Sequence, residues 1–578
     1  MHKNRGSTLA RLGRLEEAAA AHARALESQP DFLDARIALG GVQTDLGRFV
    51  DALATLDEAA RRHPQSAPAH FQRGRALQLA GRLPEAVEAY LQTIALDAGL
   101  AQAHNNLGVI YDQAGEDARA LAYFEHAVRL QPGYVHGLLN LVAVMLRLKR
   151  FTEAVPYLRQ LLKLDPGNAD AWNKLGLALH EQQAFEEVEA CYRRAVEFDP
   201  ANCDALINLG NLRLDMERDA EAEALYRRAL DVDGRSVEAL NGLRSTLVKS
   251  GRDEEAIAIT EQLLAVKPDH AIARFHLSWM MLGHGLLEDG FREYAWRPSR
   301  RDPAAPPAGM QWAESLPEDM RGLRVLLCKD QGIGDEIFFL RFAPWLKRRG
   351  AWVRYLATPK IASLVARSGV VDEVATEYRH DAGVHLAINV GDLPHLLGLR
   401  ELAEIPPPIP LSPLPEQRER ARRQLADFGP PPYIAVTWRA GRDKLKYVGR
   451  LVRSLSKALT LETLAGYLPG TGSVVSLQRQ PNAGEVEKLA GILGRPVLDL
   501  DALNEDLEAM LGVLAEIDAY YTVSNANVHL LAGLNRTATV FVPFPPEWRW
   551  MVEGEESPWF PGCRLIRQSR DRSWPVPP

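Results

Sequence analysis

The stretch AQAHNNLGVIYDQAGEDARALAYFEHAVRLQPGY, residues 101–134, is one copy of the repeat that decides the fold of the N-terminal half. It holds two apolar segments of helical period, separated by the turn residues QAGED and closed by Pro132. Prolines recur on the same 34-residue grid at Pro30, Pro64, Pro132, Pro166, Pro200 and Pro268. Chance does not keep one register over eight periods, so the spacing predicts eight units of two helices each.

Small residues follow the same grid. One series of glycines lies ten residues after the proline positions, at Gly40, Gly74, Gly108, Gly176 and Gly210. A second series is Gly13, Gly47, Gly81, Gly115 and Gly251. We expect the small residues to mark where paired helices cross closely, and the proline to end the second helix, because it cannot continue it.

This pattern resembles the tetratricopeptide repeat, in eight copies covering residues 1–270. The resemblance implies an α-solenoid with a concave groove that usually binds a peptide. Asn106, Asn140 and Asn208 share one repeat position, and protein O-GlcNAc transferases are similar in carrying an asparagine ladder in their groove. A carboxamide donates and accepts at once, so these three residues are candidate contacts to the backbone of an acceptor peptide. The alternative is that they are solvated helix residues.

The repeats are followed by two connecting segments. Residues 271–302 begin like a ninth repeat and then become rich in aromatic side chains, so we expect them to be capping helices. Residues 303–321 are rich in proline and predict a linker.

The second half of the chain has the pattern of an α/β protein. An apolar run, GLRVLLC at 322–328, leads through a glycine loop into an apolar helix, which is the opening of a doubly wound fold. This first unit is expected to span 322–414, with a charged connector helix at 415–430 and a second unit at 431–578. Two such units in tandem predict two Rossmann-like domains that face each other across a cleft.

Four motifs carry a resemblance that covers nearly the whole chain. They are QGIGD at 331–335, VSLQR at 475–479, PFPPEWRW at 543–550 and SPWFPGCRLIRQ at 557–568. The chain resembles bacterial proteins that join tetratricopeptide repeats to a glycosyltransferase of the GT-B fold. These are similar to lipopolysaccharide heptosyltransferases and protein O-GlcNAc transferases, and the architecture resembles that of flagellin glycosyltransferases.

Asp335 is the first candidate for the base that such a transfer needs at the acceptor hydroxyl. It follows Gly332 and Gly334, which would let the backbone approach the substrate, and it opens a helix. The heptosyltransferase resemblance implies a functional acidic residue here. The alternative is that Asp335 only interacts with the helix dipole. Glu336 is the second choice, because it would point elsewhere on the helix.

The helix start after the strand AYYTVS is the best candidate for binding the donor phosphate. Its residues include Ser524, Asn525 and His529, and a strand that leads into a helix presents free N–H groups to an anion. Relatives commonly have Asp-Thr where this chain has Ser524-Asn525, and this departure either changes the donor or weakens catalysis. His529 would contact phosphate or serve packing.

Further donor contacts are expected from Arg439 after the strand YIAVTW, from Lys457 and from Gln478. A cation would neutralise the leaving phosphate, and the resemblance places Gln478 where relatives hold the nucleoside. Asp499-Leu500-Asp501 is similar to the metal-binding pair of a different glycosyltransferase class. The class that this chain resembles generally works without metal, so no metal and no cofactor are predicted.

Composition excludes several other functions. Hydrophobic residues are 46% and charged residues 25%, as in soluble globular proteins, and a net charge of −7 gives no support to nucleic-acid or membrane-surface binding. The four cysteines form no CxxC pair, so neither a zinc site nor a disulfide framework is indicated. The start of the chain lacks a secretory signal and no apolar run is long enough for a membrane span, so a cytoplasmic protein is predicted.

The sequence therefore predicts an inverting, metal-independent glycosyltransferase. It would move a sugar from a UDP- or CMP-linked donor to Ser or Thr hydroxyls of a protein in the repeat groove. Flagellin is the acceptor that the architecture suggests, by analogy alone. Two alternatives stay open. One is a glycosyltransferase of cell-envelope polysaccharide synthesis whose repeats recruit partners, and the other is a repeat scaffold whose transferase half is not catalytic.

Overall fold

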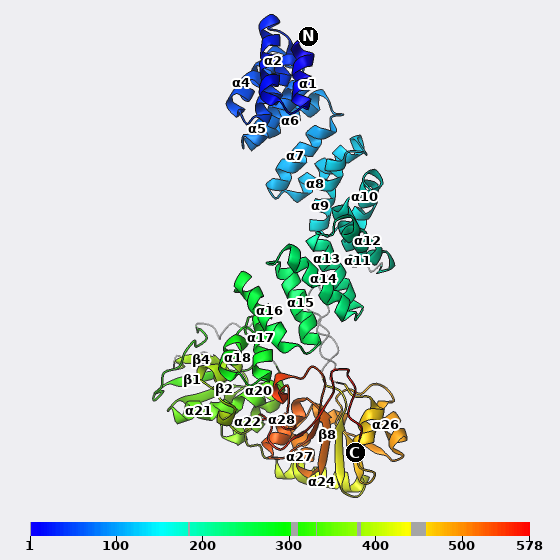
Figure 1. The fold of residues 1–578 in the computed structure, drawn as a ribbon. Coiled ribbons are helices and arrows are strands. Elements are labelled where there is room, and N and C mark those ends of the chain that lie inside the picture. The colour runs from blue at the N-terminus through cyan, green and yellow to red at the C-terminus, as the bar shows by residue number, and fades with distance from the viewer. Residues whose placement is uncertain are drawn as a thin grey trace. The chain divides into compact units, whose positions relative to one another are not determined.

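The computed structural model describes residues 2–182, 185–301, 310–330, 332–378, 383–440 and 458–577. The chain divides into two compact units, Met1–Gly234 and Arg235–Pro578. The first unit is built from helices, and the second contains further helices and two parallel β-sheets (Figure 1). Among the described residues, no helix combines the length and the apolar character needed to cross a membrane.

The helices of the first unit follow one another in antiparallel pairs, as the repeat grid predicts (Figure 1). They are α1 (His2–Arg11), α2 (Leu15–Ser28), α3 (Leu33–Asp45), α4 (Phe49–Arg62), α5 (Ala67–Leu79), α6 (Leu83–Leu96), α7 (Ala101–Gln113), α8 (Asp117–Leu130), α9 (Val135–Arg147), α10 (Phe151–Leu164), α11 (Ala169–Glu181), α12 (Phe185–Phe198), α13 (Cys203–Asp215) and α14 (Asp219–Val232).

Close helix crossings explain the first glycine series and confirm its predicted role. A Cβ on Gly74 would lie 2.8 Å from the ring of Tyr90, and one on Gly108 would lie 2.6 Å from the ring of Phe124. The same crossing sets Gly40 against Leu56, Gly176 against Tyr192 and Gly210 against Tyr226. Each pair of helices therefore packs a large side chain of the second helix onto the bare backbone of the first.

The second glycine series lies in the turn between the two helices of a pair. All five of these glycines have positive φ, between 67° and 76°, which is the left-handed region that other residues avoid. Lys149 and Glu217 occupy the same repeat position at φ of 57° and 61°. These two repeats therefore keep the turn at the expense of backbone strain.

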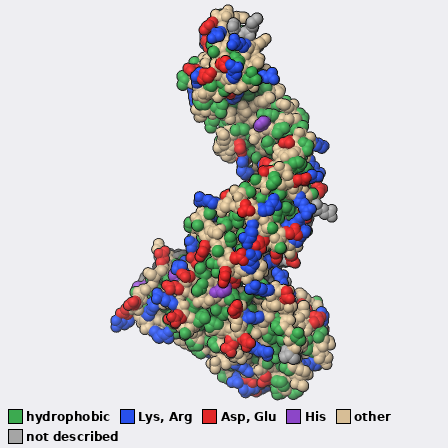
Figure 2. All heavy atoms as spheres, viewed as in Figure 1, with side chains coloured by type: hydrophobic (Ala, Val, Ile, Leu, Met, Phe, Trp, Pro, Cys, Tyr) green, Lys and Arg blue, Asp and Glu red, His purple; other side chains and the backbone are tan. Residues whose placement is uncertain are grey.

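Charged side chains join successive repeats at the surface. Arg48, which precedes α4, contacts Glu16 of α2 at 2.8 Å, and Arg159 of α10 contacts Glu187 of α12 at 2.8 Å. Figure 2 shows basic and acidic side chains intermingled on the visible face. All four side chains are about half exposed, so these pairs contribute little to stability compared with the buried crossings.

The second unit opens with α15 (Val237–Lys249), α16 (Asp253–Val266), α17 (Ala271–Gly283), α18 (Leu287–Tyr294) and α19 (Pro298–Arg301). The pair α17–α18 continues the repeat pattern, but its second helix is short. Phe291 and Tyr294 of α18 are buried, and Phe291 meets the ring of Trp548 edge-on at 5.7 Å. α18 therefore buries its rings against the α/β part of the chain.

The first sheet has the strand order β3-β2-β1-β4, with all neighbours parallel. Its strands are β1 (Arg324–Cys328), β2 (Trp352–Leu356), β3 (Glu373–Ala375) and β4 (Leu386–Asn389). The accompanying helices are α20 (Ile333–Phe339), η1 (Leu340–Phe342), α21 (Ala343–Arg348), η2 (Pro359–Ile361), α22 (Ala362–Ser368), η3 (Val390–Asp392), α23 (Leu393–Leu396) and η4 (Leu402–Glu404).

The segment predicted as a linker packs on this sheet where it is described, at 310–321. Trp312 forms a parallel bridge to Ala387 of β4, and the N–H of Ala313 donates to the Ala387 carbonyl at 2.9 Å. Met320 is fully buried. The proline content predicts a linker, and the structure adds that two of its apolar side chains are buried, which removes them from water.

The second sheet has the order β10-β9-β8-β5-β6-β7, again all parallel. Its strands are β5 (Tyr433–Thr437), β6 (Ser473–Ser476), β7 (Val497–Asp499), β8 (Ala519–Val523), β9 (Thr539–Val542) and β10 (Arg564–Arg567). The helices are α24 (Pro415–Phe428), α25 (Leu461–Tyr467), α26 (Glu485–Leu493), η5 (Asp501–Asn504), α27 (Leu507–Glu516), α28 (Ala526–Gly533) and η6 (Trp548–Trp550). The sequence did not predict β7 and β10, which are short edge or near-edge strands.

The strained turn at Lys149 gives a prediction for stability. Lys149→Gly removes a Cβ from the left-handed region and should stabilise the folded repeats by about 1 kcal/mol. Gly115→Ala, at the same repeat position, is the matched opposite change and should destabilise them by a similar amount. Thermal unfolding followed by circular dichroism measures both. A lower melting temperature for Lys149→Gly would contradict this assignment of strain.

Candidate functional site

Each parallel sheet has one point where the strand order reverses direction. In the first sheet this lies between β1 and β4, and in the second between β5 and β8. Open parallel sheets bind ligands outside the carboxyl ends of the strands at such a point. Half of the predicted site residues lie in the segments that follow β1 and β8, so the topology puts these residues where a ligand would be expected.

The two loops lead into helices that contact each other. Gly334 of α20 lies so close to α28 that a Cβ there would be 3.2 Å from the His529 ring and 3.5 Å from Cα of Ala526. His529 is largely buried and also packs edge-on against Phe338, with ring centroids 5.8 Å apart. The sequence suggested that Gly334 lets the backbone approach substrate, but the close approach here is to α28. Gly332 precedes α20, and a Cβ there would lie 3.5 Å from Oδ2 of Asp335, which is ordinary van der Waals contact.

Asp335 projects from the first turn of α20 and forms an ion pair with Arg549 of η6. The Asp335 side chain is 25% exposed and that of Arg549 12%, so both are within reach of solvent. Burial is the largest influence and opposes the charge of Arg549, but Asp335, Tyr294 and Glu547 together outweigh it and raise the pKa of the guanidinium above its ordinary value. The candidate base is therefore held beside a cation that the sequence analysis did not select.

Glu336, the second choice, has a different environment. It is buried, and its carboxylate accepts hydrogen bonds from the hydroxyls of Tyr355 and Thr358 and from the N–H of Thr358. Burial and this carboxylate raise the pKa of Tyr355 well above its usual range. Glu336 thus joins α20 to the end of β2, whereas Asp335 pairs with Arg549.

The start of α28 is less open than its sequence suggested. Oδ1 of Asn525 accepts from the N–H of Asn527 at 2.9 Å, and the Val528 N–H reaches the Asn525 carbonyl at 3.3 Å. The Asn525 Nδ2 donates to Thr522 and to Tyr520 of β8. The expectation of free amides is wrong for these two groups, because the asparagine caps its own helix. A phosphate would have to replace this cap.

Ser524 also has a partner that the sequence did not indicate. Its hydroxyl donates to Oε2 of Glu547 at 2.7 Å, and Glu547 is itself buried. Glu547 precedes η6 and contributes to the field that keeps Arg549 charged. Relatives commonly have an aspartate at the position of Ser524. In this chain the position holds a serine, but the carboxylate of Glu547 lies beside it.

Arg439 and Gln478 lie at the carboxyl ends of β5 and β6. The Gln478 amide accepts from the N–H groups of Trp438 and Arg439 at 3.1 and 2.9 Å, and donates to the carbonyls of Arg439 and Arg479. Its side chain thus joins two strand ends. The Arg439 guanidinium contacts Glu485 at 3.2 Å and is about one-fifth exposed. Lys457 lies outside the described residues.

The asparagines on the repeat grid are bonded to the preceding repeat. Asn140 donates to Asn105 at 2.9 Å and Asn208 donates to Asn173 at 3.0 Å, while Asn106 donates to the Tyr90 hydroxyl at 3.0 Å. Asn105 and Asn173 are buried, whereas the three predicted residues are partly exposed. Donation through Nδ2 leaves the amide oxygens of Asn140 and Asn208 as the groups turned away from their partners.

Arg297, which follows α18, fills the reversal point of the first sheet. Its guanidinium is fully buried and contacts Asp330 after β1 at 2.8 Å and Asp392 after β4 at 2.6 Å. It also donates to Oδ1 of Asn389 at 2.6 Å. Burial opposes this charge, but Asp392 and Asp330 outweigh it and raise the pKa of Arg297 above its ordinary range. The protein's own side chain thus takes the place where this sheet would bind a ligand.

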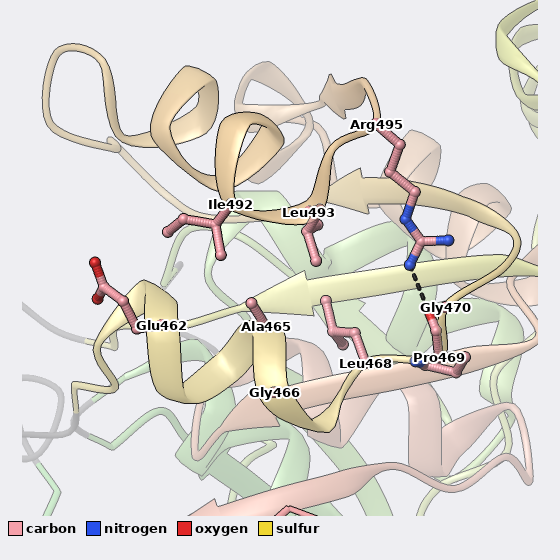
Figure 3. A pocket seen from close by; sticks show the side chains of 9 residues that line it. All are labelled: Glu462, Ala465, Gly466, Leu468, Pro469, Gly470, Ile492, Leu493 and Arg495. Atoms are coloured by element: carbon pink, nitrogen blue, oxygen red, sulfur yellow. Dashed lines mark hydrogen bonds between the residues drawn. The ribbon is translucent and has the colours of Figure 1, made fainter.

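A surface pocket of about 390 Å³ lies elsewhere, between α25 and α26 (Figure 3). Its lining includes Glu462, Leu468, Ile492 and Arg495, and the Arg495 guanidinium donates to the Gly472 carbonyl at 2.7 Å. The residues before β6 and β7 form one wall, so the pocket lies at the amino ends of these strands. It is therefore distant from the carboxyl ends where Asp335 and Ser524 lie.

The Asp499-x-Asp501 pair serves the local backbone. Oδ1 of Asp501 accepts from the N–H of Gln480 at 2.8 Å, and Oδ1 of Asp499 accepts from the N–H of Asp501 at 3.1 Å. Within the described ranges, no group of three or more His, Cys, Asp or Glu side chains is arranged to hold a metal ion.

Comparisons with known proteins identify the helical part. Two tetratricopeptide-repeat family models match, one at residues 71–135 and 145–202 and the other at 9–76 and 213–276. Protein FlbA of Caulobacter vibrioides is 25% identical over 334 residues, which cover 53% of this chain and 53% of FlbA. The chain thus spans about half the length of this curated relative.

Solved structures with similar helices were also found. One is PilF of Pseudomonas aeruginosa, which is 22% identical with a TM-score of 0.32 and covers 36% of this chain and 95% of PilF. Another is the C-terminal part of a repeat protein from Cytophaga hutchinsonii, which is 14% identical with a TM-score of 0.35 and covers 42% of this chain and 98% of that structure.

Removing Arg297 should show how strongly it holds the first sheet. Arg297→Met leaves two buried carboxylates without their cation and should destabilise the second unit by about 3–5 kcal/mol. Arg321→Met breaks the exposed pair with Asp319 and should cost at most about 1 kcal/mol. Chemical denaturation measures both. Equal losses in the two variants would contradict the assigned role of Arg297.

The asparagine contacts give a second prediction. Asn140→Ala removes the donor to the buried Asn105 oxygen and should destabilise the first unit by about 1–3 kcal/mol. Lys174→Ala, at the same repeat position, breaks only an exposed pair with Asp170 and should change stability by less than about 1 kcal/mol. If Asn140→Ala unfolds at the wild-type temperature, the inter-repeat bond does not matter for stability.

The repeat spacing, the glycine crossings and the two family matches agree with one another, and the helix pairs within residues 9–276 are tetratricopeptide repeats.

Proposed function

We propose that the chain is a glycosyltransferase with the GT-B arrangement of two Rossmann-like halves, and that its repeats hold a protein acceptor. The observation that carries this proposal is the meeting of α20 and α28. Each helix follows a strand at the reversal point of its own parallel sheet, and their contact sets Gly334, the neighbour of Asp335 in the chain, against His529 and Ala526. A transfer reaction needs a base and a phosphate site from two such halves at one place.

The second half is the better candidate for holding the nucleotide. Its strand order, β10-β9-β8-β5-β6-β7, is that of a doubly wound dinucleotide-binding sheet, and Arg439 and Ser524 follow the two strands at its reversal point. The corresponding point of the first half contains the buried Arg297. The proposed donor contacts are Arg439, Lys457, Gln478, Ser524, Asn525 and His529, with Gly332 and Gly334 beside them.

In the proposed reaction Asp335 takes the proton from a Ser or Thr hydroxyl of the acceptor. The hydroxyl oxygen attacks the anomeric carbon of the sugar from the face opposite the phosphate. The bond between that carbon and the phosphate oxygen breaks, the electron pair leaves with the UDP or CMP, and the anomeric configuration inverts. Without a metal ion, cationic side chains of the protein neutralise the charge that builds up on the departing phosphate.

The repeats supply the protein-binding part of the proposal. Asn106, Asn140 and Asn208 are partly exposed on the first helices of their repeats, and the bonds to the preceding repeat orient their amides. Amide oxygens at a fixed repeat position suit the N–H groups of an extended segment. Flagellin is the acceptor that we propose, by analogy of architecture alone.

A second candidate function is a scaffold that binds protein partners without transferring sugar. The capped start of α28 favours it, because the Asn527 N–H is already bonded to Asn525. The ion pair that occupies Asp335 favours it as well. In a scaffold these contacts would be permanent, and nucleotides would not displace them.

Thermal shift with UDP, CMP, GDP, ADP and dTDP separates the two functions. A nucleotide at 100 times its dissociation constant should stabilise the protein by about 2.7 kcal/mol, which raises the melting temperature by a few degrees. We expect a response to UDP or CMP that Arg439→Gln reduces. Arg423→Gln, on the exposed face of α24, should leave the response unchanged. A flat response to all five nucleotides in folded protein would contradict the transferase and support the scaffold.

A further inference from the structure

Arg549 contacts the candidate base Asp335 but has no role in the proposed reaction. Its guanidinium lies 4.5 Å from the ring centres of both Phe338 and Trp548, so one side chain is stacked between the two halves of the second unit. Its Nη2 forms the ion pair with Asp335. The aromatic rings hold the head group in place beside Asp335.

The ion pair engages Asp335 with a cation, whereas the proposed reaction needs the same carboxylate to take a proton. A carboxylate can take a proton from an acceptor hydroxyl only if the hydroxyl reaches it within hydrogen-bond distance. In this structure a guanidinium occupies Oδ1 of Asp335. A guanidinium also binds phosphate oxygens in the same forked geometry as it binds a carboxylate. The Asp335 carboxylate and a donor phosphate can therefore both bind the Arg549 guanidinium.

The neighbouring cations fit this role less well. Arg341 stacks on Phe338 at 4.3 Å, but it is buried and donates to the carbonyls of Phe338 and Trp559. Arg439 lies at the end of β5 and contacts Glu485. Of the cations in the described part of the chain, Arg549 is the one that contacts the candidate base directly.

We propose that Arg549 changes partner during the reaction. In the ligand-free protein it pairs with Asp335, and when a nucleotide sugar binds it turns to a phosphate oxygen and leaves Asp335 open to the acceptor hydroxyl. This inference rests on the proposed function. Glu547 lies close enough to favour the charge of Arg549, so the guanidinium stays ionised while its partners exchange.

The exchange would couple the base to binding of the donor. Before the donor arrives, Arg549 engages Oδ1 of Asp335, so the acceptor hydroxyl has to compete with a guanidinium for that oxygen. Once the phosphate has taken the guanidinium, Oδ1 is open to the acceptor hydroxyl. The base and the cation for the leaving phosphate then become available in the same step, whichever substrate binds first.

Calorimetric titration of the full chain with UDP, and separately with inorganic pyrophosphate, tests the exchange. Asp335→Asn removes the competing carboxylate and should tighten UDP binding about tenfold. Arg549→Gln removes the proposed phosphate contact and should weaken it about tenfold or more. Asp319→Asn and Arg321→Gln alter an exposed pair of the same type and should leave the affinity unchanged.

Two results would overturn the inference. If the wild type binds UDP but Asp335→Asn binds it equally or more weakly, the exchange is wrong while the transferase proposal stands. If the folded wild type binds no nucleotide from the panel, both proposals fall.

A crystal structure of the wild type with UDP covers the case in which a variant does not fold. Arg549 against a phosphate and apart from Asp335 supports the exchange, and an intact pair beside bound UDP overturns it.

Discussion

The second unit depends on one cluster of aromatic rings. Trp548 meets Phe291 of α18 at 5.7 Å, Phe338 of α20 at 5.6 Å and Trp559 at 5.2 Å, in each case nearly perpendicular. These rings come from the last repeat, the first sheet and the C-terminal segment, and aromatic edges packed on faces favour fixed relative positions. Arg549 lies on this cluster, so the geometry of Asp335 follows from the packing of rings that themselves take no part in chemistry.

Much of the fold could be predicted because its signals are local. Eight of the strands and the repeat helices follow from apolar runs, glycines and prolines within a few residues of one another. β7 has three residues and β10 has only two apolar residues between two arginines, so neither gives a strong local pattern. The candidate site residues after β1 and β8 could be selected because parallel topology collects strand ends on one edge, and the helices that follow these strands do contact each other.

The partners of the site residues could not be predicted in the same way. Arg549 lies 214 residues from Asp335, and no periodic pattern links them. Glu547 and Arg297 were missed for the same reason, because tertiary packing selects them. Asn105 and Asn173 are different. Each precedes its partner by 35 residues, one repeat plus one position, so the grid contained a signal that a search for spaced pairs would have found.

Arg297 has a consequence for where the functional module begins. By sequence, the α/β part starts after the proline-rich segment, and a fragment cut there would seem complete. Such a fragment would lack Arg297 and leave Asp330 and Asp392 as two like charges in a closed space. It would also lose Phe291 and Tyr294 from the aromatic cluster. The ninth helix pair thus continues the repeat pattern in sequence, but it packs as part of the α/β module. The smallest module that keeps these contacts includes α17, α18 and Arg297.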